Sequence, residues 1–259
     1  IRNTLRYLLG ALDGFDNSQL VAFDEMPELE KWVAARLFEL DKTVIEKVNA
    51  YDFHAVFTEL HDFCNSDLSA FYFDIRKDML YCDALDSKSR IAALTMMDRC
   101  FKSLVAWIAP ILCFTADEAW LAYTGNSEDS IHLHEYQKMP EEWQNASLIQ
   151  KWGQVRSIRS QVTTALENAR SDSKIGGSLQ ASVVLSLPEA EAKLLSDIDL
   201  PALFITSDVQ IIDDNAEQLG AEIHLAEGGK CARCWKILPE VATNEDICMR
   251  CKDVIGSAK

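Results

Sequence analysis

The sequence predicts a mainly α-helical protein, in which a helical bundle is followed by a small α+β unit and a short cysteine-rich tail. Apolar residues recur at helical spacing over about the first 125 residues, which is typical of packed amphipathic helices. Alternating apolar runs appear only after the pair Gly176-Gly177, and two Cys-x-x-Cys pairs stand near the C-terminus. We therefore expect three parts, namely residues 1–140, 141–229 and 230–259.

Three long amphipathic helices are expected to form the bundle, after a helical pattern that is already under way at the N-terminus. The first begins after Pro27, a residue favoured at the start of a helix, and its apolar stripe covers residues 29–48. The same spacing of three and four residues continues over residues 53–75 and again over residues 91–108.

A shorter helix is expected after the third long one. Pro110 should end or kink the third helix, because proline has no N–H to donate. Thr115, followed three residues later by Glu118, forms a capping-box pattern and predicts that a helix restarts there. The alternating run at residues 131–136 then indicates a possible strand.

The second part is expected to combine one long helix with short strands. Helical spacing covers residues 145–170, and the glycine pair then breaks the helix. Strand-like runs follow at residues 179–187, 202–206, 209–212 and 222–225.

Charge is distributed unevenly along the chain, whose formal net charge is −16. Residues 145–180 carry five basic and two acidic side chains, residues 181–229 carry one basic and ten acidic, and residues 230–259 carry six basic and four acidic. Screening over about 8–10 Å leaves the near charges dominant. An acidic protein with two basic islands can therefore bind a polyanion locally.

Several absences narrow the class of protein. No run of about 18 uncharged apolar residues occurs, so we expect a soluble chain with no membrane span. The N-terminus has neither an initiator Met nor a signal segment, which indicates a piece of a longer chain. Half of the eight cysteines lie in two Cys-x-x-Cys pairs, which fits a metal and a reducing, cytoplasmic compartment better than a disulfide framework. The sequence contains no glycine-rich phosphate loop, no G-x-S-x-G motif and no isolated carboxylate pair, so nothing in it suggests a catalytic site.

The strongest motif is a pair of cysteine knuckles, Cys231-Ala232-Arg233-Cys234 and Cys248-Met249-Arg250-Cys251, separated by residues 235–247. Four thiolates at this spacing complete a tetrahedral Zn²⁺ site with no open position for water, so we expect one structural zinc ion. Such a short tail buries little core, and metal binding should fold it. Redox dithiols are the alternative, but a redox pair would be expected beside a βαβ pattern.

The other cysteines lack ligand-like spacing and are interpreted as buried structural thiols. They are Cys64, Cys82, Cys100 and Cys113.

Basic and aromatic side chains suggest two places for nucleic acid to bind. Arg233, Trp235 and Arg250 lie within or beside the knuckles, and cations next to a stacking ring are typical of single-strand recognition. Alternatively, Trp235 packs on the zinc site and the cations are merely solvated. Arg156 and Arg159 share one helical face, which is either a solvated flank or a phosphate contact.

Three helical segments, a helix-to-strand junction and the tail resemble class I isoleucyl-tRNA synthetases. The likeness is carried by RNTLRYLLG at residues 2–10, by residues 68–81 and 108–120, and by KIGGSLQA at residues 174–181. The two knuckles are similar to the C-terminal zinc finger of the bacterial isoleucyl type. The resemblance covers the whole chain and implies a helical anticodon-binding domain.

The resemblance also implies a function. The parent enzyme would use ATP to join isoleucine to isoleucine tRNA, but the family's His-Ile-Gly-His and Lys-Met-Ser-Lys-Ser motifs are absent here. The chain alone should be inactive and monomeric, lacking the N-terminal catalytic domain with its ATP site and the editing domain. It would grip the anticodon stem-loop. The candidate tRNA contacts are Arg2, Asn3, Arg6, Arg156, Arg159, Arg233, Trp235 and Arg250.

Two other functions remain open from the residues themselves. A zinc-containing helical scaffold could dock proteins without binding nucleic acid, and its acidic surface would suit a basic partner. A DNA-repair module would share the finger but would need a base-flipping site that the sequence does not show. Steeply salt-dependent binding to tRNA is expected if the chain recognises tRNA and is not expected of a protein-interaction scaffold.

Overall fold

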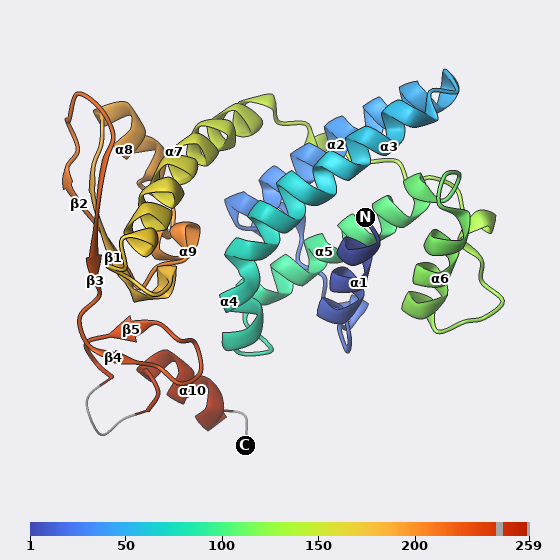
Figure 1. Cartoon of the computed structure of the whole chain (residues 1–259). Helices are drawn as coiled ribbons and strands as arrows, with labels where there is room; N and C mark the ends of the chain where they lie inside the picture. Colours follow the sequence, from blue (N-terminus) through green and yellow to red (C-terminus); the bar gives the residue numbers. More distant parts are fainter. Residues whose placement is uncertain (242–245, 258–259) are drawn as a thin grey trace. The chain divides into compact units, whose positions relative to one another are not determined.

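A computed structural model of the chain describes residues 1–241 and 246–257. The chain divides into two compact units, coloured along the sequence in Figure 1. Unit 1 contains Ile1–Asp74 and Leu85–Ile149, and unit 2 contains Ile75–Ala84 and Gln150–Lys259. Unit 1 is built mostly from helices, unit 2 combines helices with short strands, and the predicted mainly α-helical class is confirmed. The three-part division by sequence stays a prediction.

Unit 1 is the helical bundle. Its helices are α1 (Arg2–Ala11), α2 (Glu28–Asn49), α3 (Phe53–Asp62), α5 (Lys88–Ile108) and α6 (Cys113–Thr124), with short 3₁₀ turns at η1 (Asn17–Gln19), η2 (Phe23–Glu25), η4 (Ile131–Leu133) and η5 (Glu141–Trp143). The predicted stripe of α2 is buried, and α1 packs on α5 and α6. Trp32 and Trp107 are almost completely buried in this core. Burying side chains of that size supplies much of the apolar stabilisation.

The second predicted helix is continuous but not α-helical throughout. After α3 the chain winds as a π-helix, η3 (Phe63–Phe73), and then as α4 (Asp74–Cys82). Tyr72 lies in the π segment and its hydroxyl donates to the Glu30 carboxylate at 3.1 Å. Periodicity over so few residues does not separate π from α winding, so this change could not be predicted.

The start of α6 differs from the prediction. Helix α5 ends at Ile108, two residues before Pro110, as expected. The backbone then turns, with the Leu112 N–H donating to the Ile108 carbonyl at 2.8 Å, and α6 begins directly after this turn. Thr115 therefore lies inside the helix, and the prediction that it caps the helix was wrong.

Residues 131–136 do not form a strand. The Asp117 carboxylate accepts hydrogen bonds from the Ser130 hydroxyl at 2.6 Å and from the Ile131 N–H at 3.2 Å. These bonds hold Ile131–Leu133 as a 3₁₀ turn, with Ile131 buried. Local side-chain acceptors thus satisfy the backbone that a strand would have paired with a neighbour.

Unit 2 contains a three-stranded sheet beside the long helix α7 (Ala146–Ser171), which begins in unit 1 and confirms the predicted helix. The strands are β1 (Ala181–Ser186), β2 (Asp208–Asp213) and β3 (Gly220–Leu225), in the order β2-β1-β3. Strand β1 pairs parallel with β2 and antiparallel with β3. The 3₁₀ turn η6 (Ser178–Gln180) precedes β1, and α8 (Glu189–Leu195) and α9 (Leu200–Phe204) connect β1 to β2.

Residues 202–206 are mostly helical rather than a strand. Asp199 accepts a hydrogen bond from the Ala202 N–H at 3.1 Å, and Pro201 occupies the first turn of α9. A parallel pair of strands needs a crossover connection, which is usually helical. The apolar composition of this segment therefore serves a buried helix, with Leu203 and Phe204 in the core.

The C-terminal part of unit 2 is a small finger made from β4 (Gly229–Lys230), β5 (Ile237–Leu238) and α10 (Met249–Ser257). Two glycines permit its tight crossing. A Cβ atom on Gly228 would overlap the Leu238 carbonyl, and one on Gly229 would overlap the Val241 carbonyl. No helix among the described residues is long and apolar enough to cross a membrane.

Candidate metal centre and nucleic-acid interface

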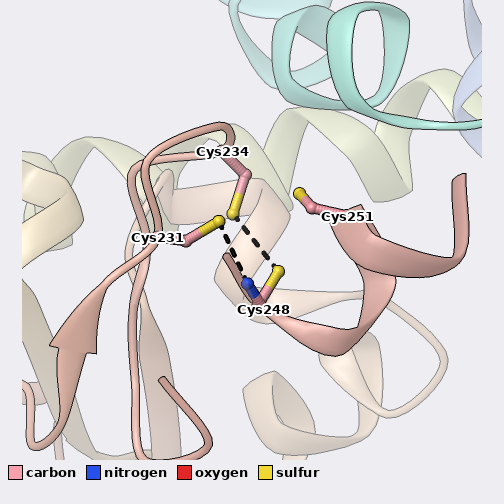
Figure 2. A group of neighbouring side chains, drawn as sticks. All are labelled: Cys231, Cys234, Cys248 and Cys251. Atoms are coloured by element: carbon pink, nitrogen blue, oxygen red, sulfur yellow. Dashed lines mark hydrogen bonds between the residues drawn. The ribbon is translucent and has the colours of Figure 1, made fainter. Parts of the chain in front are cut away.

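Four cysteine side chains converge in the finger (Figure 2). Cys231 and Cys234 come from the turn after β4, whereas Cys248 and Cys251 flank the start of α10. Their sulfur atoms all lie within 4.8 Å of one another, and the Cys234 and Cys248 sulfurs are 3.8 Å apart. Tetrahedral Zn²⁺ with bonds of about 2.3 Å places its sulfur ligands about 3.8 Å apart. The donor set and its spacing therefore fit zinc.

The surroundings of the cluster lower the pKa of one cysteine thiol and raise the pKa of two others. Burial acts to raise the pKa of Cys231, but N–H groups of the knuckle backbone, including Cys248 N at 3.3 Å from the Cys231 sulfur, lower it to about 6. Burial raises the pKa of Cys234 and Cys248. Four close thiolates repel one another unless a cation lies between them, so the site suits a divalent metal.

A fifth cysteine, Cys82, packs against this cluster from α4. Burial and the nearby Asp78 carboxylate raise the pKa of the Cys82 thiol to about 11. The neutral thiol points its weak donor at the Arg233 carbonyl, 3.9 Å away. Cys82 therefore belongs to the packing around the metal centre and not to the ligand set.

The remaining cysteines are only partly as expected. Cys64, Cys82 and Cys100 are buried, whereas Cys113 is exposed, so its assignment to the core was wrong. Cys113 is the first residue of α6, directly after the turn that follows Pro110. The buried residues of α6 begin only at Ala116, one turn later.

Arg233, in the first knuckle, binds the end of α4. Its guanidinium donates to the carbonyl oxygens of Cys82 and of Tyr81, the latter at 3.2 Å. These are among the last carbonyls of a helix, which have no partner within it. A cation at this end also interacts favourably with the helix dipole.

Arg250 occupies the same place in the second knuckle, and it also binds α4. It lies 2.7 Å from the Asp78 carboxylate and 3.0 Å from that of Asp83. Burial acts to lower the pKa of Arg250, but the hydrogen bond to Asp78 and the charges of both carboxylates raise it above its usual value. The two knuckle arginines thus clamp one helix, and we call these contacts the arginine clamp.

Trp235 lies on the surface of the finger, with 60% of its side chain exposed. Its backbone has φ of 66°, a conformation uncommon for a bulky residue. The Lys230 ammonium lies 5.7 Å from the centre of the Trp235 ring. Trp235 is therefore largely open to solvent, with a cation beside its ring.

The other candidate contacts occupy two places. Arg2, Asn3 and Arg6 are exposed on α1, where Arg2 forms a two-pronged ion pair with Glu118 at 2.9 Å. Arg156 and Arg159 are half-buried on α7, and the Arg159 side chain donates to the Leu203 carbonyl at 2.8 Å. Arg159 thus joins α7 to α9.

Two family models match the chain. The model described as the anticodon-binding domain of tRNA ligase matches residues 30–185, which is more than half of the chain. The chain belongs to this family. A second model, described as the zinc finger found in FPG and IleRS, matches residues 228–254 and spans all four cysteines. The finger match and the four-cysteine cluster together support one structural zinc ion.

Curated relatives of this chain bear the name isoleucine–tRNA ligase. The relative from Gluconobacter oxydans is 44% identical over 99% of this chain and 27% of its own length. Those from Zymomonas mobilis and Agrobacterium fabrum are 41% and 42% identical over 99% and 94% of this chain. The chain spans about a quarter of the length of the curated relatives it matches. The resemblance inferred from the sequence is confirmed.

Sequence reasoning missed the partners that α4 supplies to the finger. Asp78, Cys82 and Asp83 lie about 150 residues before the knuckles, and none has metal-ligand spacing. The only signal was the repeated Cys-x-Arg-Cys pattern, in which arginine precedes the second cysteine of both knuckles. That pattern gave no indication of what the arginines bind.

Proposed function

We propose that this chain is the anticodon-binding, C-terminal part of an isoleucine–tRNA ligase and that it binds the anticodon stem-loop of isoleucine tRNA. The observation that carries the proposal is the match of residues 30–185 to the anticodon-binding family. The parent enzyme would make isoleucyl-tRNA from isoleucine, ATP and tRNA. Its ATP site, catalytic domain and editing domain would lie in the part of the relatives that this chain does not span.

The proposal includes the metal ligands and the setting of the protein. Cys231, Cys234, Cys248 and Cys251 would hold the zinc ion, and a fully occupied thiolate site is structural rather than catalytic. A zinc–thiolate centre suits a reducing compartment such as the cytoplasm, since oxidation of the thiols would release the metal. The chain would act as a monomer that contacts RNA.

The exposed side chains are the ones we assign to direct RNA contact. Trp235 offers a ring with Lys230 beside it, and Arg2, Asn3 and Arg6 are exposed on α1. Arg159, Arg233 and Arg250 are half-buried and their guanidinium groups bind protein groups, so their contribution would be to hold the surface in shape. The ion pair of Arg2 with Glu118 is exposed to solvent, so Arg2 would remain accessible to a phosphate. A protein-interaction scaffold gains no support from the family matches.

Binding across a salt series tests this function. The zinc-loaded chain should bind isoleucine tRNA more tightly than the same tRNA with a changed anticodon and more tightly than duplex DNA. Its affinity should fall linearly with salt on logarithmic axes, because phosphate contacts release counterions. Equal affinity for all three nucleic acids, or no salt dependence, would refute anticodon recognition by this chain.

Trp235→Ala is expected to weaken binding to isoleucine tRNA by about 1–3 kcal/mol, because a stacked base loses its platform. Trp235→Phe should restore most of the affinity, since it keeps an aromatic face. Zinc content, measured in both variants, should stay at the wild-type value because the side chain is exposed. Unchanged affinity in Trp235→Ala would remove this ring from the RNA-binding surface.

A further inference from the structure

The outer face of α4 carries a cation and an aromatic ring that no motif predicted. Lys77 and Tyr81 are one helical turn apart and both are exposed, Tyr81 to 67%. Within residues 1–241 and 246–257, neither side chain forms a hydrogen bond, ion pair or ring contact. Tyrosine usually buries its ring in a core or an interface, so a free ring beside a free lysine is a candidate contact surface.

The arginine clamp holds this face next to the zinc finger, within unit 2. Arg233 donates to the Tyr81 carbonyl at 3.2 Å, and the exposed Trp235 follows two residues later. One guanidinium contact therefore joins the backbone of Tyr81 to the segment of the finger that carries Trp235. Each ring has a lysine near it, Lys77 one turn before Tyr81 and Lys230 over the ring of Trp235.

The clamp also changes the charge of the α4 face. Asp78 and Asp83 would repel a phosphate chain, but Arg250 lies within 3.0 Å of both carboxylates and neutralises one of the two negative charges. Lys77 is the charged residue of α4 that is classed as exposed, and it lies one helical turn before Tyr81. Lysine is depleted in protein–protein interfaces, whereas a cation beside a stacking ring is typical of single-strand binding.

We propose that Lys77 and Tyr81 on α4, together with Trp235 and Lys230 on the finger, form one surface that binds unpaired RNA nucleotides. Bases stack on the two rings, and the lysines contact the phosphates. The inference rests on the proposed function and extends it to a helix in which the sequence analysis assigned no RNA contact. It assigns the zinc finger a second role, which is to complete a binding surface that α4 begins.

The test measures affinity for isoleucine tRNA across a salt series with the full 259-residue chain. Tyr81→Ala is expected to weaken binding about 5- to 150-fold, and Tyr81→Phe is expected to bind as the wild type does. Lys77→Ala should lower the salt slope by about 0.7, the value for one phosphate contact on a single strand. Tyr51→Ala is the matched control, since Tyr51 is 83% exposed and belongs to unit 1, whereas Lys77, Tyr81, Lys230 and Trp235 belong to unit 2.

Zinc content and amide exchange of α4 separate loss of contact from loss of structure. Both should be unchanged in Tyr81→Ala, because the ring is exposed. If wild type and Trp235→Ala behave as proposed but Tyr81→Ala binds like Tyr51→Ala, the α4 surface is refuted while the proposed function stands. If the wild-type chain does not bind isoleucine tRNA, both proposals fail together. If Tyr81→Ala weakens binding only because α4 loosens, the ring is structural and the inference is wrong.

Discussion

Replacing Cys248 with serine is expected to abolish zinc binding and to unfold the finger while unit 1 stays folded. The fully buried core of the finger consists of its four cysteines, Val241 and the packed thiol of Cys82. One buried valine contributes only about 1.5–3 kcal/mol. Zinc binding in comparable finger peptides contributes about 10–16 kcal/mol, so the metal supplies most of the folding free energy.

Zinc content and amide exchange together check this prediction. The wild-type chain should hold one zinc ion and protect the amides of α10 from exchange, whereas Cys248→Ser should hold none and exchange freely there. Cys113→Ser is the matched control, because Cys113 is exposed and lies outside the cluster. A Cys248→Ser chain that kept both its metal and its protected amides would contradict a structural zinc site.

Loss of the metal should also reach α4. The clamp residues Arg233 and Arg250 each precede the second cysteine of a knuckle, so their positions depend on the folded finger. When the finger unfolds, the last carbonyls of α4 lose Arg233, and Asp78 and Asp83 lose Arg250. We therefore expect faster amide exchange at the C-terminal end of α4 in the zinc-free chain.

The metal centre was predictable from sequence because its chemistry is local. Four thiolates are sufficient for zinc, and two Cys-x-x-Cys pairs place them on tight turns whatever the rest of the fold does. The helices at residues 29–48 and 91–108 were predictable for a similar reason, since their large apolar residues recur at a spacing of three and four along the chain. Both predictions depend on residues that are near one another in the chain.

Features that depend on distant contacts were missed or wrong. Residues 202–206 have strand-like composition, but the connection between parallel strands and the Asp199 cap make them mostly helical. The strand expected at residues 131–136 is a turn because Asp117 captures its backbone. The α4 surface could not be predicted because the contact that holds Tyr81 beside the finger comes from Arg233, far along the sequence.

The arginine clamp is expected to hold α4 against the finger independently of the zinc ion. Replacing Arg233 and Arg250 together with alanine should leave zinc bound, because neither side chain is a ligand, but should detach α4 from the finger. Hydrogen bonds to charged groups contribute about 1.5–3 kcal/mol each, so the double variant should lose several kcal/mol of docking free energy. Amide exchange of α4 measures this loss, and Arg170→Ala on α7 is the control, since Arg170 is exposed and pairs only with Glu167 among the described contacts.

The same variant should bind isoleucine tRNA more weakly although no proposed RNA contact has been removed. Without Arg250, no paired cation offsets the negative charges of the Asp78 and Asp83 carboxylates, and these charges repel the phosphates. Without Arg233, Tyr81 is no longer held near Trp235. The loss should therefore exceed that of Trp235→Ala alone, whereas an affinity equal to the wild type would mean that α4 and the finger bind RNA independently or that α4 does not bind it.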